Sequence, residues 1–294
     1  MIFTCDKNKL QESIAIAQKA ITGKSTMPIL EGLYIEASEN IVTIIGSDKD
    51  VSIETKFEAD VTEPGKLVVD AKIFGEIIRK LPNDKIKIET VSEEAIRITC
   101  QKSVFDLLHM NAEDFPSLPK INENMIFSIN QGILKNMIKG TSFAIAQDET
   151  RPILQGILFE IKDSKLNLVA LDGYRLAIRT ENIDTNNTIN AVIPGKTLNE
   201  VAKILEDSEE IVNITFTPNH ILFNMGDTKV ISRLLEGEFI KYDALLPKEH
   251  KLQIEVDKQT LQNGIERASL MAKEGNSNLV KFDICLLYTS DAAD

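Results

Sequence analysis

Cysteine, positive charge and long apolar runs are all scarce in this chain of 294 residues. Its three cysteines, Cys5, Cys100 and Cys285, form neither a CxxC pair nor an even set, so we expect no disulfide framework and no zinc site. No apolar run reaches the roughly 18 residues that a membrane-spanning helix needs. The segment from Met1 to Asp6 also lacks the order of basic, apolar and small residues that marks a signal peptide. We therefore expect a soluble, globular protein of the cytoplasm.

The scarcity of positive charge argues against a simple nucleic-acid binder. The chain has 33 lysines and arginines against 45 acidic residues, for a net charge of −12. A protein that neutralises phosphates needs clustered lysine and arginine, so the distribution of charge has to be examined as well as its sum. The length and an apolar content of 43% favour two or three domains with substantial cores.

Complete catalytic motifs are also missing. Residues 23–25 and 195–197 imitate the end of a phosphate-binding loop, but Gln18 and Asn190 stand where its first glycine belongs. The three histidines are far apart, and none has a metal-ligand partner at helical or hairpin spacing: His109, His220 and His250. Asp48 and Asp50 have no specified partner acid, so a turn explains them. We expect no catalytic residue, no metal and no cofactor, and thus no enzyme.

The chain repeats itself at an offset of 124 residues. Residues 1–4 return as 125–128, and residues 28–36, with the sequence PILEGLYIE, return as 152–160, with the sequence PILQGILFE. An apolar stripe with the spacing of one buried helix face occurs three times: Leu10, Ile14, Ala17, Ile21; Leu134, Ile138, Thr141, Ile145; and Leu261, Ile265, Ala268, Ala272. Ordered matches along a whole unit indicate duplication or a shared fold.

Short β-rich runs lie between these helices, separated by Gly, Asn, Asp and Pro turns. Each unit is therefore predicted to be α+β, with curved antiparallel strands on one side and two helices on the other. We place the first domain at residues 1–120, the second at 121–247 and an incomplete third at 248–284. Residues 285–294 match nothing earlier, and we interpret them as a foreign or frame-shifted end; a divergent natural tail is the alternative.

The predicted helices have a charge opposite to that of the chain. Residues 7–24, 71–81, 130–146, 195–205 and 258–273 together carry +10, which leaves −22 for everything else. Solvated helix faces usually mix both signs, and that interpretation stays open. The functional interpretation is that helices of successive repeats line one surface that meets phosphates, while the acidic sheet side repels DNA. Such contact reads no bases, as sliding requires.

Four segments, taken in order, resemble the bacterial DNA polymerase III beta subunit family, the replicative sliding clamps. They are residues 28–30, 114–116, 170–177 and 193–196, and the similarity covers about residues 1 to 284. The resemblance implies a DNA-clamp fold with antiparallel sheets outside and helices inside. It further implies a head-to-tail homodimer that encircles double-stranded DNA and tethers the polymerase as a processivity factor. A clamp loader opens such a ring with ATP bound to the loader, and the clamp itself hydrolyses nothing.

The resemblance also assigns site residues by matching position. The partner-peptide pocket, which would hold segments of DNA polymerase and clamp-loader subunits, consists of Leu154, Leu171, Gly173, Tyr174, Arg175, Leu176, Ile240, Ala244 and Leu245. The DNA contacts are Lys24, Lys72, Arg151 and Lys196. The dimer interface places Phe105 and Leu107 of one subunit against Leu270 and Met271 of the next. Ile240 and Ala244 depart from the family, which often has proline and arginine there, and any pocket residue could instead be ordinary core.

Two other classes of function remain open from the residues alone, namely a DNA-independent repeat scaffold and an enzyme acting on nucleotides or sugars. The third repeat keeps its first helix and little sheet to cover it. We therefore expect that the chain as printed forms no stable closed ring.

Overall fold

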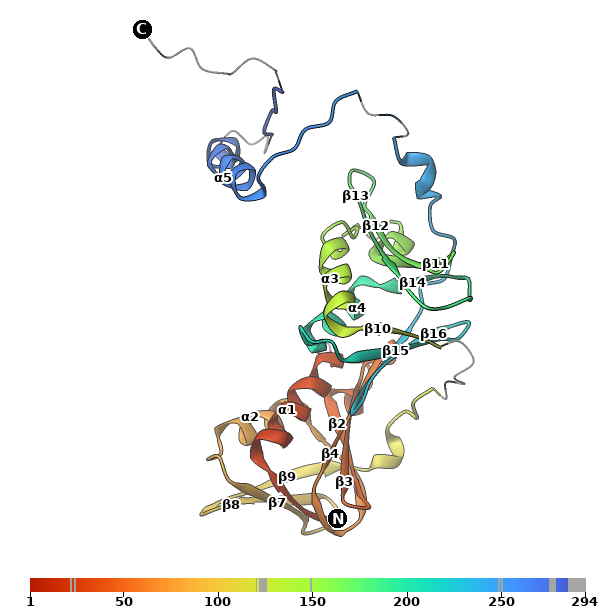
Figure 1. Ribbon diagram of the computed structural model, residues 1–294. Helices are drawn as coiled ribbons and strands as arrows, with labels where there is room; N and C mark the ends of the chain where they lie inside the picture. Colours follow the sequence, from red (N-terminus) through yellow and green to blue (C-terminus); the bar gives the residue numbers. More distant parts are fainter. Residues whose placement is uncertain are drawn as a thin grey trace. The chain divides into compact units, whose positions relative to one another are not determined.

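The computed structural model describes residues 1–21, 23, 25–119, 121, 126–148, 150–247, 249, 251–274 and 279–284. The chain divides into two compact units, Met1–Phe239 and Ile240–Asp294 (Figure 1). The proposed DNA contact Lys24, His250 and the unmatched residues 285–294 lie outside the described residues. The domain boundaries near residues 120 and 247 stay predictions.

The first repeat begins unit 1 and contains nine strands and two α-helices within its described residues. The strands are β1 (Ile2–Asp6), β2 (Gly32–Ser38), β3 (Ile41–Ser47), β4 (Val51–Glu58), β5 (Asp60–Glu63), β6 (Gly65–Asp70), β7 (Lys85–Thr90), β8 (Ala95–Cys100) and β9 (Ser103–Met110). The helices are α1 (Lys7–Ala17) and α2 (Ala71–Lys80), with short 3-10 turns η1 (Gln18–Ala20), η2 (Pro28–Glu31) and η3 (Ala112–Asp114). The helix predicted over residues 7–24 is an α-helix only over residues 7–17, so Ile21, the last residue of its apolar stripe, lies beyond the helix.

The second repeat has the same order with one strand fewer among its described residues. Its strands are β10 (Ile126–Asn130), β11 (Gly156–Lys162), β12 (Lys165–Leu171), β13 (Leu176–Asn182), β14 (Ile189–Pro194), β15 (Ile211–Phe216), β16 (His220–Met225) and β17 (Thr228–Arg233). Its helices are α3 (Gln131–Ser142) and α4 (Gly195–Ile204), and η4 (Pro152–Gln155) precedes β11.

Local sequence explains where the helices begin and end. Asp70 caps α2, because its carboxylate accepts a hydrogen bond from the Ile73 backbone N–H at 2.7 Å. Pro82 follows Leu81, whose extended backbone ends the helix. Asp6 and Asn130 cap α1 and α3 in the same way, so equivalent residues of the two repeats perform equivalent tasks.

Antiparallel pairing joins all these strands into two sheets. The larger sheet has 13 strands in the order β10-β15-β16-β17-β4-β3-β2-β6-β9-β8-β7-β1-β5, and the smaller has the order β13-β12-β11-β14. The pairing of β17 with β4 carries the larger sheet from one repeat into the other. Val51 and Ile53 of β4 accordingly belong to the same apolar cluster as Val230 of β17.

The helices of each repeat lie side by side and cover strands with their apolar faces (Figure 1). Leu10, Ile14 and Ala17 of α1 are buried with Phe74 and Ile78 of α2 in one core. The equivalent stripe of α3 is buried as well: Leu134, Ile138 and Thr141. The predicted α+β fold, with antiparallel sheets and two helices in each complete repeat, is confirmed.

Unit 2 contains η5 (Tyr242–Leu245) and α5 (Lys258–Glu274). The third apolar stripe lies on α5, but Leu261 and Ile265 are 39% and 37% exposed. The described residues of this unit supply no strand that could cover the stripe. The periodicity therefore predicted the helix, whereas its burial depends on a sheet that this unit does not show in its described part.

Candidate functional site

Six of the nine predicted pocket residues belong to unit 1 and surround the hairpin of β12 and β13. Leu171 and Leu176 are direct partners across the two strands. Leu154 lies in η4, just before β11, which pairs with the other side of β12. Leu154 and Leu171 are buried and Leu176 is half-buried, so the last of these presents apolar surface that a ligand could still cover.

The loop of this hairpin, residues 172–175, is held by one carboxylate. Oδ1 of Asp172 accepts hydrogen bonds from the backbone N–H groups of Tyr174 and Arg175, both at 3.0 Å. These two bonds, followed by the Arg175 side chain, hold the pKa of Asp172 below its ordinary value. Gly173 has a φ of +94°, which a residue with a Cβ adopts only with strain. The loop consequently presents the Tyr174 side chain wholly to solvent.

The Arg175 side chain contacts both Asp172 and Phe143. Its Nε donates to Oδ2 of Asp172 at 2.8 Å, and its guanidinium carbon lies 5.9 Å from the centre of the Phe143 ring. Phe143 is largely exposed at the end of α3. The sequence did not indicate Phe143, because it lies off the apolar stripe of its helix and its exposure depends on the tertiary fold.

The other three predicted pocket residues belong to unit 2. Ile240, Ala244 and Leu245 are exposed, and the Ala244 N–H donates to the Lys241 carbonyl at 3.3 Å within the turn η5. The two units are described separately, so a pocket made of all nine residues remains a proposal.

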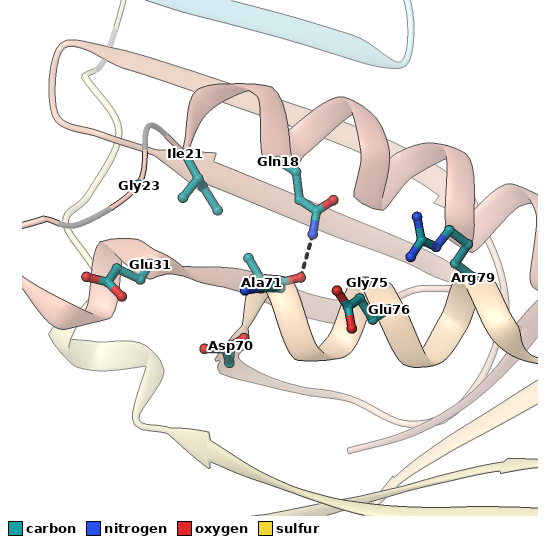
Figure 2. Close-up of a pocket in the computed structure, with 10 residues that line it drawn as sticks. Gln18, Ile21, Gly23, Glu31, Asp70, Ala71, Gly75, Glu76 and Arg79 are labelled. Carbon is teal, nitrogen blue, oxygen red and sulfur yellow. Dashed lines mark hydrogen bonds between the residues drawn. The ribbon is translucent and has the colours of Figure 1, made fainter.

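The predicted DNA contacts in the described part of the chain lie at the beginnings of helices and turns. Lys72 is exposed in the first turn of α2, and Lys196 occupies the equivalent place in α4. Arg151 is exposed immediately before η4. The surface beside α2 is hollowed by a pocket of about 590 Å³ (Figure 2).

That pocket separates η1 from α2, and the Gln18 side chain bridges the two by donating to the Ala71 carbonyl (Figure 2). Its charged lining is mixed: Lys72, Arg79, Glu31, Asp70 and Glu76. Since acidic side chains outnumber basic ones, the pocket is not an anion site by itself, although Lys72 and Arg79 are exposed cations of its lining.

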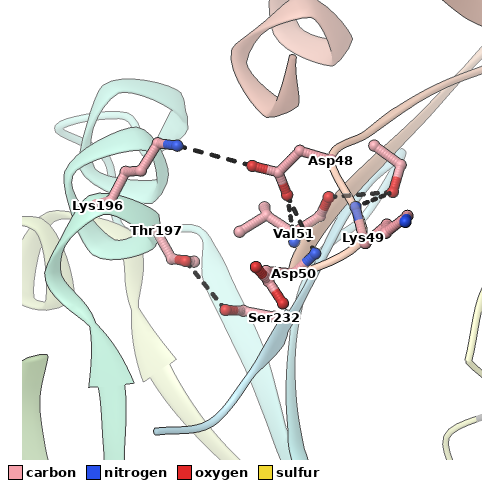
Figure 3. Close-up of polar contacts among 8 residues, drawn as sticks. Asp48, Lys49, Asp50, Val51, Lys196, Thr197 and Ser232 are labelled. Carbon is pink, nitrogen blue, oxygen red and sulfur yellow. Dashed lines mark hydrogen bonds and ion pairs between the residues drawn. The ribbon is translucent and has the colours of Figure 1, made fainter. Parts of the chain in front are cut away.

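Lys196 lies at the junction of the two repeats. Its Nζ is 3.7 Å from Oδ2 of Asp48, which follows β3 in the first repeat, and its side chain is 64% exposed (Figure 3). Oδ1 of Asp48 accepts from the backbone N–H groups of Asp50 and Val51 at 3.1 and 2.8 Å, so the predicted turn is present. Lys196 therefore shares its charge between a carboxylate of the neighbouring repeat and the solvent.

The predicted interface residue Phe105 lies on β9 and is 43% exposed, whereas Leu107 is half-buried against the core of the first repeat. The opposite face of β9 exposes Val104 and Leu108, which the sequence did not single out. Leu270 and Met271 on α5 are both exposed in unit 2.

Among the residues that the structure describes, no three His, Cys, Asp or Glu side chains lie where they could hold a metal ion. None of the described helices is both long and apolar enough to span a membrane.

Two family models match the chain. The model of the DNA polymerase III beta subunit N-terminal domain matches residues 1–119, and the model of the central domain matches residues 128–241.

Known proteins are similar over nearly the whole chain. The beta sliding clamp of Bacillus subtilis (strain 168) is 39% identical over 291 residues, which cover 96% of this chain and 77% of that protein. The crystal structure of the DNA polymerase sliding clamp from Bacillus subtilis matches with a TM-score of 0.90 at 38% identity, over 94% of this chain and 75% of that one. The DNA polymerase beta subunit of Streptococcus pyogenes matches with a TM-score of 0.89 at 28% identity, over 93% and 75%.

Proposed function

Since the chain belongs to the DNA polymerase III beta subunit family, the beta sliding clamps, we propose that it encircles duplex DNA and tethers the replicative polymerase as a processivity factor. It takes part in DNA replication and acts in the cytoplasm. In its full-length form it makes a head-to-tail homodimer, and clamp-loader subunits place that ring on DNA. No membrane is involved.

The single observation that carries this proposal is the repeated fold of unit 1, which presents paired helices with exposed lysines on an acidic protein. Lys72 and Lys196 occupy equivalent first turns of α2 and α4. Contacts of this kind attract phosphates without reading bases. A protein that holds DNA only in this way is free to move along it.

The protein catalyses no reaction in this proposal. It acts by enclosing the DNA in a ring, and the ATP that drives ring opening is bound to the loader. Lys24, Lys72, Arg151 and Lys196 supply the weak contacts with the DNA backbone.

Polymerase and loader bind through a short peptide in the apolar pocket around Leu171 and Leu176. Arg175, held by Asp172 and Phe143, gives this pocket a polar rim of fixed geometry. Leu154, Gly173 and Tyr174 complete the part in unit 1, and Ile240, Ala244 and Leu245 the part in unit 2. The ring closes where Phe105 and Leu107 meet Leu270 and Met271 of the partner subunit.

Retention on DNA of different topology tests the function. The full-length form, with a complete third repeat, is loaded by its clamp loader onto nicked circular DNA or onto linear DNA with free ends, and then washed at rising salt. We expect retention on the circle and rapid loss from the linear form, because a closed ring leaves only over an end. Equal loss from both would reject encirclement, and absence of binding to either would favour a DNA-independent scaffold. Phosphate or sugar release without loader would show an enzyme.

A further inference from the structure

A pocket of about 510 Å³ lies between α1 and β4, wholly within unit 1. Most of its lining comes from the first repeat, and the turn between β16 and β17 of the second repeat contributes Asp227 and Thr228. The turn is attached to β4 by a hydrogen bond from the Lys56 N–H to the Asp227 carbonyl at 2.9 Å. The pocket is therefore made by both repeats, and its lining differs from the residues proposed for DNA, for the partner peptide and for the ring interface.

Three buried hydroxyl groups line this pocket, those of Ser13, Thr55 and Thr228. Thr228 Oγ1 donates to Thr55 Oγ1 at 3.3 Å. Ser13 is only 5% exposed, and within the described part of the chain its hydroxyl has no hydrogen-bond partner. A buried polar group without a partner is costly, so Ser13 favours a ligand that brings a polar group into the pocket.

The unpaired charge of the lining is negative. Among the two lysines, Lys56 is paired with Glu54 at 3.0 Å, which leaves Lys9 as the cation without an ion pair in this lining. Three exposed carboxylates oppose it: Glu12, Glu58 and Asp227. A positive ligand with several hydrogen-bond donors therefore suits the pocket better than an anion does.

The second repeat has a pocket of about 410 Å³ at the equivalent place, between α3 and β13. At the offset of 124 residues, Thr55 corresponds to Arg179. Ile16 likewise corresponds to Gly140. The Arg179 side chain lies so close to α3 that a Cβ on Gly140 would be 2.5 Å from its Nε. The fold thus accommodates an arginine side chain between helix and strand at this place.

The first repeat does not fill its pocket in this way. Thr55 is too short to cross the space, and Ile16 gives the helix side an apolar wall against which an alkyl chain can lie. The lining also has three carboxylates, whereas Glu181 is the one carboxylate among the lining residues of the second pocket. The first pocket consequently offers the partners that an arginine needs, and its own lining supplies no arginine.

We propose that the pocket between α1 and β4 binds an arginine side chain of a partner protein, whose guanidinium pairs with the lining carboxylates and donates to the Ser13 hydroxyl. Guanidinium fits because its planar fork can donate to carboxylate and hydroxyl oxygens at the same time. The volume exceeds the need of one side chain, so the peptide backbone beside the arginine fits as well. The inference goes beyond the proposed function, because it requires neither DNA nor a closed ring.

Titration of the ¹⁵N-labelled chain with a short peptide tests this site. The probe is acetyl-Gly-Arg-Gly-amide, and its control contains citrulline, which has nearly the shape of arginine without the charge. We expect saturable chemical-shift changes at the amides of Ser13, Thr55 and Thr228, and about fivefold weaker binding of the citrulline peptide. Equal binding of the two peptides, or shift changes only at other surfaces, would overturn the proposal.

Two variants distinguish the pocket from general attraction to an acidic protein. Asp227→Asn changes an exposed turn residue, so the fold should persist while the arginine peptide binds about threefold more weakly. Glu181→Gln removes the same charge from the equivalent pocket of the second repeat and should leave the affinity unchanged. Equal losses in both variants would reject the site. Free arginine amide that binds as tightly as the peptide would reject a protein partner in favour of a small guanidinium compound.

Discussion

Lys72 and Lys196 occupy equivalent positions in the two repeats but have different surroundings. Lys72 lines a pocket with mixed charge, whereas Lys196 faces the Asp48 carboxylate at 3.7 Å. Replacement of both lysines by glutamate should weaken DNA binding for every sequence alike and make its salt dependence shallower, because fewer counterions are released. Filter binding at several salt concentrations with unrelated duplexes measures both effects. A loss confined to one sequence would contradict sliding.

Asp48 should limit the contribution of Lys196 to DNA binding. Asp48→Asn keeps an oxygen that can accept from the backbone of its turn but removes the charge beside Lys196. We expect modestly tighter DNA binding with a steeper dependence on salt. Asp50→Asn is the matched control, since it removes the same charge two residues away; equal effects of the two variants would mean that the ion pair has no specific role.

Leu176 offers the clearest test of the partner pocket at the residue scale. Leu176→Ala removes apolar surface from a half-buried position, so it should cost about 1 to 2 kcal/mol of peptide binding while the fold persists. Calorimetry with a clamp-binding polymerase peptide measures the change, and Ile133→Ala on the exposed side of α3 serves as control. Unchanged affinity in a folded variant would remove this assignment.

At the scale of elements, the close approach of α1 to β3 depends on Gly46. A Cβ at this position would lie 2.2 Å from the backbone carbonyl oxygen of Ala17 at the end of α1. Backbone cannot move aside as a side chain can, so Gly46→Ala should destabilise the protein by about 1 to 3 kcal/mol. Gly264→Ala, in open surroundings on α5, should instead favour its helix by about 1 kcal/mol. Urea unfolding for the first variant and circular dichroism for the second check these opposite signs.

The sequence predicted the helices and also that the third repeat has little sheet to cover its helix. The stripe of Leu10, Ile14 and Ala17 is buried, because the same repeat also supplies strands. The identical spacing on α5 leaves Leu261 and Ile265 exposed. Periodicity reports the face of a helix, and the burial of that face depends on residues far away in the chain.

The dependence on residues far away in the chain also explains which features of the candidate site the sequence did not predict. The ion pair of Asp48 with Lys196 joins residues in different repeats, and no local pattern connects them. Phe143 lies under Arg175 only because α3 ends beside the hairpin of β12 and β13. By contrast, the turn at residues 172–175 could be expected from its Asp-Gly pair, which needs no distant partner.

At the scale of the whole molecule, unit 1 and α5 should differ sharply in stability. The core residues of α1 and α3 are fully buried, whereas Leu270 and Met271 of α5 are 65% and 71% exposed. A helix of this length is marginal in water without packing. Hydrogen exchange on the chain as printed should therefore find protected amides in α1 and α3 and rapid exchange along α5.

Hydrogen exchange combined with sedimentation also tests whether the chain as printed closes a ring. A two-subunit ring closed through Leu270 and Met271 buries part of α5, so assembly would protect its amides. We expect no stable two-subunit species and rapid exchange along α5 at every protein concentration, because the described part of unit 2 supplies no strand to cover this helix. A tight two-subunit species with slow exchange across α5 would show that this helix is packed in the assembly and that the ring closes without further sheet.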